Sequence, residues 1–383
     1  MRFVVIYPLL LLFIVLRGIW PAFDSKKVRW CLAATLIPGA LFPAVVRFIG
    51  GSMVAPDLPY SVVVIGQLCQ MYVFCLGGLL AAREILSIPA RIVGLPFPWL
   101  GRCKKLTVAI FASAVLLDIY GVWTAACDMT VKRVTVAVQN LPAELEGLTI
   151  AQLSDIHASS LVHASRVQKI VDATNALKPD VVMITGDFVD GEVEKRGNDL
   201  KPLTQLQAPL GVWGVLGNHE YYVDYQGWRK FLPTLNIGML YNSHVVLTKN
   251  GVRFTVAGLL DPMAERYGLE LPDIDKALAG APKTDLTILL SHQPKWAHKY
   301  VDRVQLMLSG HTHGAQVFAL RPIVGKLNSG FIEGLYPVSD DQTGAKLQLY
   351  VNPGIDVWNG FVLRIGTRGE ITLLTLTRAN NDE

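Results

Sequence analysis

Four long apolar stretches near the start of the chain constrain its fold more than any other feature. Each contains at most one charged residue over about 20 positions, the length that a helix needs to cross a bilayer. Because backbone polar groups in hydrocarbon must be paired within their own segment, such stretches are expected to be helical. The predicted spans are 3–20, 30–49, 60–82 and 106–127.

These spans predict a membrane protein in two parts. The transmembrane region covers residues 1–130, and a second domain covers 134–383. The first span also resembles a secretory signal, but no A-x-A-like cleavage site follows it. Three further spans would anchor the chain in either case.

The two parts carry opposite net charge. Residues 1–133 contain 13 Lys and Arg against 5 Asp and Glu, whereas residues 134–383 contain 22 against 26. Eight of the first 13 lie in the loops at 26–29 and 83–105, and the loop at 50–60 has none. By the positive-inside rule, these two loops face the cytoplasm, so the second domain is predicted to be extracytoplasmic, on a plasma (inner) membrane. The basic character is attributed to topology, and nucleic-acid binding is not expected.

Asp118 is a charge inside the fourth span. An ionisable residue within a span often binds a substrate or relays protons. Asp118 could accordingly contact a lipid substrate or belong to a transporter. The preferred interpretation is that Asp118 pairs or is hydrated locally, in the half of its helix nearer the second domain.

Residues 134–383 alternate between strand-like and helix-like segments, which is typical of an α/β fold. Strands are predicted at 148–153, 181–185, 212–216, 253–257, 286–290, 304–308, 347–351, 361–365 and 371–376. Helices are predicted at 166–177, 227–235 and 274–279. All five cysteines precede residue 128, so this domain can hold neither a disulfide framework nor a thiolate metal site.

Five polar clusters follow apolar strand-like runs in this domain. They lie at 154–157, 186–190, 216–220, 291–292 and 310–313. Ligand sites of α/β folds collect at the carboxyl ends of strands, so these clusters are expected to meet.

The clusters are rich in metal ligands. Asp155 and His157, like His311 and His313, are two residues apart, so an extended backbone would point each pair to one side. The Asp187 carboxylate has two oxygens and can bridge two ions. Seven candidate ligands result: Asp155, His157, Asp187, Asn218, His292, His311 and His313. Oxygen and imidazole ligands suit Mn²⁺, Zn²⁺ or Fe rather than Ca²⁺, and two such ions can activate a bridging hydroxide for attack on phosphorus.

The series Asp155-x-His157, Gly186-Asp187-x-x-Asp190, Gly217-Asn-His-Glu220, His292 and Gly310-His-x-His313 resembles the calcineurin-like metallophosphoesterase superfamily. The surrounding residues are similar to the bacterial membrane-linked subfamily that includes the YkuE and YaeI proteins. The resemblance covers residues 134–378. It implies two β-sheets packed face to face and flanked by helices, two divalent ions with Mn favoured, and hydrolysis of phosphoesters.

The resemblance also implies a role for each residue. Each ion would have four protein ligands with Asp187 shared: Asp155, His157 and His313 for the first, and Asn218, His292 and His311 for the second. His219 would be the general acid, a role that contributes about 10²–10⁴ in rate. Asp190 would orient His219, although a turn or helix-cap role is an alternative for this residue.

Two positions depart from the usual pattern. Gly191 stands where many phosphatases of the superfamily have an Arg that clamps phosphate. Glu220 replaces the more frequent Asp, and this change is interpreted as conservative.

The favoured hypothesis is a membrane-anchored dimetal phosphoesterase, with a phosphodiester as the favoured substrate class and a lipid head group among the candidate substrates. One alternative is a pyrophosphate hydrolase acting on a nucleotide-sugar lipid at the cytoplasmic face. Another is a non-enzymatic membrane protein with a structural metal site. The presence of His219 beside a complete ligand set favours an enzyme.

Overall fold

The chain folds into two compact units. The computed structural model describes residues 2–56, 58–92, 103–127, 129–340 and 344–379. The first unit, called the helical unit, comprises Met1–Ala126 and Asn359–Ile365. The second, called the sheet unit, comprises Cys127–Trp358 and Gly366–Glu383.

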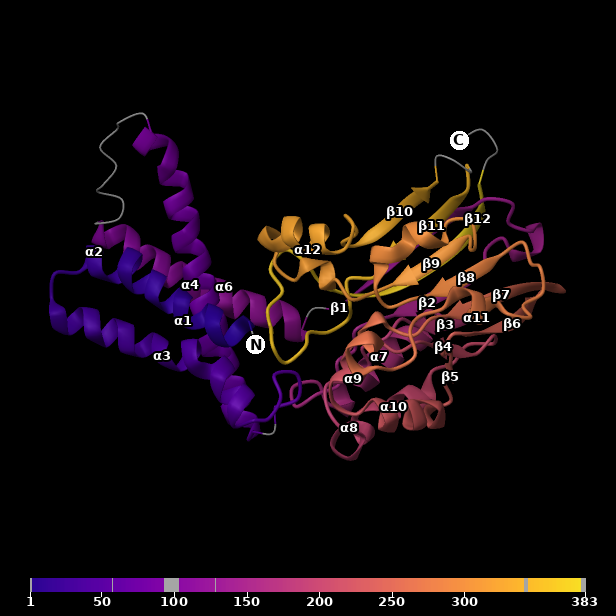
Figure 1. Cartoon of the computed structure of the whole chain (residues 1–383), viewed down its shortest axis with the longest axis horizontal. Helices are drawn as coiled ribbons and strands as arrows, with labels where there is room; N and C mark the ends of the chain where they lie inside the picture. Colours follow the sequence, from indigo (N-terminus) through magenta and orange to yellow (C-terminus); the bar gives the residue numbers. More distant parts are fainter. Residues whose placement is uncertain (1, 57, 93–102, 128, 341–343, 380–383) are drawn as a thin grey trace. The chain divides into compact units, whose positions relative to one another are not determined.

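Helices account for the first part of the helical unit. They are α1 (Arg2–Ile14), η1 (Val15–Ile19), α2 (Trp20–Ala22), α3 (Lys26–Phe48), α4 (Tyr60–Ile92) and α6 (Lys104–Cys127) (Figure 1). Among the described residues, four stretches are long and apolar enough to cross a membrane: Phe3–Ala22, Lys26–Phe48, Tyr60–Pro89 and Lys104–Ala126. The four predicted spans are therefore confirmed as apolar helices.

Glycines allow the helical unit to pack closely. A Cβ on Gly39 of α3 would overlap the backbone carbonyl of Cys69 in α4. A Cβ on Gly66 of α4 would overlap the ring of Phe42 in α3. Because lipid tails are as apolar as the helices, the hydrophobic effect does not bring helices together within a bilayer. Close packing at small residues is therefore a main source of helix association.

The segment Asn359–Ile365 belongs to the helical unit although it lies far along the chain. Gln67 and Gln70 of α4 donate side-chain N–H groups to the carbonyls of its first two residues. The ring of Phe361 meets Phe74 of α4 edge-on at 5.0 Å. The strand predicted at 361–365 is wrong, because this segment is irregular and packs its apolar side chains among helices.

Asp118 of α6 is buried. Its Oδ1 atom has no hydrogen-bond partner within the described part of the chain. The local ion pair considered for this carboxylate is therefore not seen there, and its role remains a prediction.

The sheet unit contains two six-stranded sheets. The first has the order β1-β12-β2-β3-β4-β5, and the second β10-β11-β9-β8-β7-β6. The strands of the first are β1 (Met129–Val138), β12 (Gly369–Arg378), β2 (Thr149–Leu153), β3 (Val181–Ile184), β4 (Val212–Gly214) and β5 (Gly238–Met239). Those of the second are β10 (Gly334–Ser339), β11 (Lys346–Val351), β9 (Leu306–Ser309), β8 (Thr287–Leu290), β7 (Val252–Gly258) and β6 (Ser243–Lys249). Strands β2 to β5 run parallel in the first sheet, and β7, β8, β9 and β11 do so in the second.

The main core lies between the two sheets. Successive side chains of a strand point to opposite faces. In β3, Val181 and Met183 pack in a cluster with residues of β8 and β9, whereas Val182 and Ile184 pack on the opposite side. Strands β8 and β9 alternate in the same way. The two sheets therefore pack face to face, as predicted.

Helices cover the outer faces of both sheets. The helices α7 (Ala164–Ala176), α8 (Val193–Leu200) and α10 (Tyr225–Phe231) pack on the first sheet. The elements α11 (Ile274–Leu278) and η6 (Pro294–Tyr300) pack on the second. The remaining elements are short: α9 (His219–Val223), α12 (Arg321–Leu327), η2 (Ala143–Leu145), η3 (Lys201–Gln205), η4 (Leu232–Leu235), η5 (Pro262–Tyr267), η7 (His313–Ala315) and η8 (Phe318–Leu320).

The close contact at Gly39 gives the first testable prediction. We expect Gly39→Ala to destabilise the helical unit by about 1–3 kcal/mol, the usual effect of overpacking a filled core. The measurement is the thermal midpoint of the full chain in detergent. Gly78→Ala is the matched control, because nothing lies within 4 Å of a Cβ there. Equal midpoints for the two variants would contradict the packing described for Gly39.

Candidate metal centre

The polar clusters come together at the ends of five strands. In the first sheet they follow β2, β3 and β4, and in the second they follow β8 and β9. Three groups of donor atoms form there among the described residues, and within each group the atoms lie within 4.8 Å of one another. Two of the groups share Asp187, and the third is His157, Asp190 and His219. The first group is Asp155, His157, Asp187 and His313, and the second is Asp187, His292 and His311. Asp187 is common to both groups, and Asn218 Oδ1 lies 3.1 Å from His292 Nε2.

The backbone of this centre is left-handed at several ligands, so the extended conformation predicted for them is wrong. The φ angles are 53° at Asp155, 48° at His157, 73° at His311 and 50° at His313. Non-glycine residues in this region are strained by about 1–3 kcal/mol each, and such strain is concentrated at functional sites. The side chains therefore converge through local turns rather than through the alternation of a strand.

Asp155 is held by hydrogen bonds from neighbouring loops. Ser154 Oγ donates to Asp155 Oδ2 at 2.6 Å, and the backbone N–H of His311 donates to the same carboxylate at 3.1 Å. Gly354, at φ 76°, approaches so closely that a Cβ would lie 2.8 Å from that of Asp155. The carboxylate is thereby fixed in one orientation beside His313, whose Nε2 is 3.2 Å away.

The hydrogen bonds of His292 define which of its nitrogens can hold a metal. Its Nδ1 lies 2.7 Å from the carbonyl oxygen of Thr185, so Nδ1 carries the proton. Its Nε2 lies 3.2 Å from Asp187 Oδ2. Burial acts to lower the pKa of His292, but Asp187 raises it well above its usual range. A divalent cation would bind His292 through the lone pair of this Nε2 atom.

Asp190 lies between two imidazoles. Its Oδ1 is 2.6 Å from His219 Nδ1 and 3.0 Å from His157 Nδ1. Although burial acts to raise it, the two histidines hold the pKa of Asp190 below its usual range. Burial lowers the pKa of His157, but Asp190 outweighs this effect and the pKa rises to about 9. His219 begins α9, and its Nε2 lies 3.8 Å from Asp187 Oδ2.

Glu220 joins two of the loops that carry ligands. Its carboxylate accepts N–H groups from Gly217 at 2.7 Å, Asp187 at 3.2 Å, Phe188 at 2.7 Å and Val189 at 3.2 Å. Burial and the nearby Asp187 raise the pKa of Glu220 to about 8, while these donors favour the ionised form. The sequence offered no signal for this role, since Glu220 was interpreted only as a conservative replacement.

Aromatic side chains line the centre near His219. The ring of Tyr222 lies 5.0 Å from that of His219, and its hydroxyl accepts an N–H from Asn218 at 3.1 Å. The ring of Trp358 lies 5.9 Å from His219. Tyr221 and Trp228 belong to the hydrophobic core. Trp358 was not predicted.

Asp261 is linked to the second donor group through Gln293. Gln293, which follows His292, donates to both oxygens of Asp261 at 3.0 and 3.1 Å. Burial raises the pKa of Asp261 to about 6. Asp261 therefore lies beside the centre.

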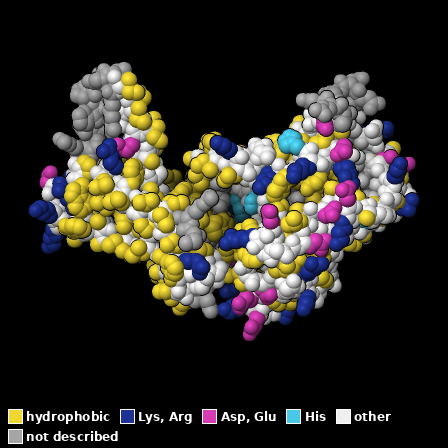
Figure 2. Space-filling view, in the orientation of Figure 1, with side chains coloured by type: hydrophobic (Ala, Val, Ile, Leu, Met, Phe, Trp, Pro, Cys, Tyr) yellow, Lys and Arg dark blue, Asp and Glu magenta, His cyan; other side chains and the backbone are white. Residues whose placement is uncertain are grey.

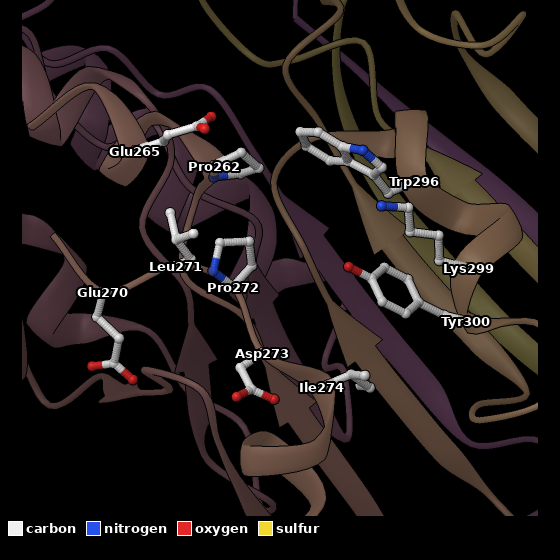
Figure 3. A pocket seen from close by; sticks show the side chains of 10 residues that line it. All are labelled: Pro262, Glu265, Glu270, Leu271, Pro272, Asp273, Ile274, Trp296, Lys299 and Tyr300. Carbon is white, nitrogen blue, oxygen red and sulfur yellow. The ribbon is translucent and has the colours of Figure 1, made fainter. Parts of the chain in front are cut away.

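A separate cavity of about 670 Å³ lies between η5 and η6 (Figure 3). Trp296 and Tyr300 line one wall, and Pro262 and Leu271 line the other. None of the predicted metal ligands lines it. This cavity is therefore not part of the metal centre.

Comparison with known proteins identifies the family. Residues 148–315 match the model of the calcineurin-like phosphoesterases. The transmembrane protein with metallophosphoesterase domain of Bos taurus is 35% identical over 82% of this chain and 71% of the bovine protein. The chain belongs to the calcineurin-like phosphoesterase family.

Other members of this family are similar to the chain. The protein of the same description from Danio rerio is 36% identical over 73% of this chain and 64% of the zebrafish protein. The uncharacterized metallophosphoesterase YkuE of Bacillus subtilis is 31% identical over 64% of this chain and 85% of YkuE. The chain thus spans 64% of the zebrafish relative and 71% of the bovine one. The resemblance predicted from the motifs is confirmed.

The hydrogen bonds to Glu220 generate a prediction. In Glu220→Gln, the amide nitrogen would face two backbone N–H groups in place of an accepting oxygen. Because each buried donor left without an acceptor costs about 1–3 kcal/mol, we expect the sheet unit to lose about 2 kcal/mol or more. The thermal midpoint of the full chain, followed by near-ultraviolet circular dichroism, measures this loss.

Glu192→Gln is the control for that variant, because Glu192 is exposed and its 3.8 Å ion pair with Lys195 lies at the surface. Exposed pairs of this kind contribute about 0–1 kcal/mol. An unchanged midpoint for Glu220→Gln would show that the carboxylate does not hold the two loops.

Proposed function

We propose that the protein is a membrane-anchored hydrolase of phosphoesters that uses two divalent ions. The observation that carries this proposal is the pair of donor groups sharing Asp187, with His219 and Asp190 beside them. Family membership and the transmembrane relatives support it.

The donor set fits the proposed ions. The first ion would be held by Asp155, His157, His313 and Asp187, and the second by Asp187, Asn218, His292 and His311. Carboxylate, amide and imidazole donors match Mn²⁺, Zn²⁺ or Fe, with Mn²⁺ favoured. When bound, such ions lower the pKa of water and offset charge on phosphoryl oxygens.

His219 is the proposed general acid. Its Nδ1 is hydrogen bonded to Asp190, which orients the ring. That bond leaves Nε2 to donate a proton to the leaving oxygen of the ester. Tyr222 and Trp358 would confine the ring in this position.

A phosphodiester is the proposed substrate class. Gly191 supplies no cationic side chain at the position where many phosphatases of the family have Arg. A diester carries one negative charge fewer than a fully ionised monoester, so it depends less on such a clamp. A lipid head group is the candidate we favour, because the chain carries four helices that are apolar enough to cross a membrane.

Metal dependence and the role of His219 can be tested together. The full chain in detergent is stripped with a chelator, reloaded with Mn²⁺ and assayed on bis-p-nitrophenyl phosphate and p-nitrophenyl phosphate. We expect turnover to require the metal and to favour the diester. His219→Ala should lower kcat by about 10²–10⁴.

His298→Ala is the control for this assay, since His298 is exposed and stacks on Phe331 away from the donor groups. Metal content should be measured in each variant. If His219→Ala keeps two ions per chain and full activity, the general-acid role is wrong. If loaded wild-type protein hydrolyses neither ester, the proposed activity on simple phosphoesters is wrong.

The sheet unit is proposed to lie outside the cytoplasm. Alkaline phosphatase fused after residue 383 should be active in intact cells, and green fluorescent protein fused there should be dark, because each folds on one side only. Fusions after residue 29 should give the reverse pattern. A fluorescent C-terminal fusion without phosphatase activity would place the sheet unit in the cytoplasm.

A further inference from the structure

The elements η8 and α12 expose a group of large apolar side chains. Phe318, Ile323 and Leu327 have 64%, 60% and 68% of their surface accessible. Among the described residues of the sheet unit, these are the three most exposed large hydrophobic side chains. They fall within ten positions of one another, although large apolar side chains elsewhere in this unit form its cores.

Basic residues accompany these apolar side chains. Ile323 and Leu327 are four positions apart in α12 and so share a face of the helix. Arg321 and Lys326 belong to the same helix. Arg321 pairs with Glu333 at 2.6 Å, so the net positive charge of this element comes from Lys326. Figure 2 shows hydrophobic side chains gathered over α12 beside a basic one. We call Phe318, Arg321, Ile323, Lys326 and Leu327 the α12 surface.

The α12 surface is joined to the metal centre through the backbone. Phe318 follows the ligand His313 by five positions, through the tight turn of η7. It also lies against Gly366, where an added Cβ would be 3.1 Å from the Cβ of Phe318. Gly366 is the first residue after Asn359–Ile365, the segment that belongs to the helical unit.

We propose that the α12 surface contacts the lipid bilayer at its interface. Four helices of this chain are apolar enough to cross a membrane, so the chain itself tethers the sheet unit to a bilayer. A short element with exposed apolar side chains and a net positive charge has the composition of an interfacial contact. Basic residues at such a contact are attracted to anionic head groups.

This contact would hold the turn containing His311 and His313 at the level of the lipid head groups. The proposed bilayer contact goes beyond the proposed hydrolysis, because it concerns which surface of the sheet unit binds lipid and not which substrate the protein cleaves. Its test can therefore be read without any enzymatic assay, and it stands or fails separately from the proposed activity.

The test places an environment-sensitive fluorescent amino acid at position 323 of the full chain. The protein is inserted in nanodiscs of phosphatidylcholine and phosphatidylglycerol, where both faces of the bilayer are accessible. We expect blue-shifted emission, several-fold stronger quenching by nitroxide-labelled lipid than at a control position, and weak quenching by iodide. Position 271 is the control, because Leu271 is also apolar and 50% exposed.

Each outcome decides the proposal. Strong iodide quenching at position 323, equal to that at 271, would show that the α12 surface faces water and would overturn the proposal. Protection from iodide without quenching by labelled lipid would show a protein cover in place of lipid and would also overturn it. A second variant with Ile323→Asp and Leu327→Asp should remove lipid quenching from a probe at position 318.

Discussion

The structure depends on the compensation of buried carboxylates. Asp155, Asp187, Asp190 and Glu220 are almost completely buried, and charged groups are destabilised by burial unless they are paired. Imidazoles face the first three, and four backbone N–H groups face Glu220. A cation shared at Asp187 would add to this balance.

The two-sheet architecture makes this concentration of charge possible. Ligands arrive from the ends of parallel strands in both sheets, so no single loop must supply them all. The loops approach so closely that a Cβ on Gly217 would overlap the Asp187 carboxylate, and one on Gly310 would overlap Ser154 Oγ. The glycines of the G-N-H and G-H-x-H motifs thus allow one loop to lie in close contact with another.

Much of this organisation could be predicted from periodicity and from motifs. The apolar spans and the strands that precede the five polar clusters follow from local patterns, and the face-to-face sheets follow from the family resemblance. The left-handed ligands and the role of Glu220 depend on contacts between distant loops, which no local pattern contains. The strands β1, β5, β6 and β10 were missed. Strands β1 and β6 expose or half-expose much of their length, which weakens their hydrophobic signal, and β5 has only two residues. The segment at 361–365 was apolar enough to suggest a strand, but its partners are helices.

That segment limits how modular the protein is. Its chain leaves the sheet unit after Trp358 and returns at Gly366, so the two units are joined at three points of the backbone rather than one. A fragment beginning at residue 127 would keep Phe361, Val362 and Leu363 while losing the helices among which they are buried. Such an excised domain would present these side chains to water and be prone to aggregation. Gene fusions or domain exchanges in this architecture must therefore transfer α4 and α6 together with the sheets.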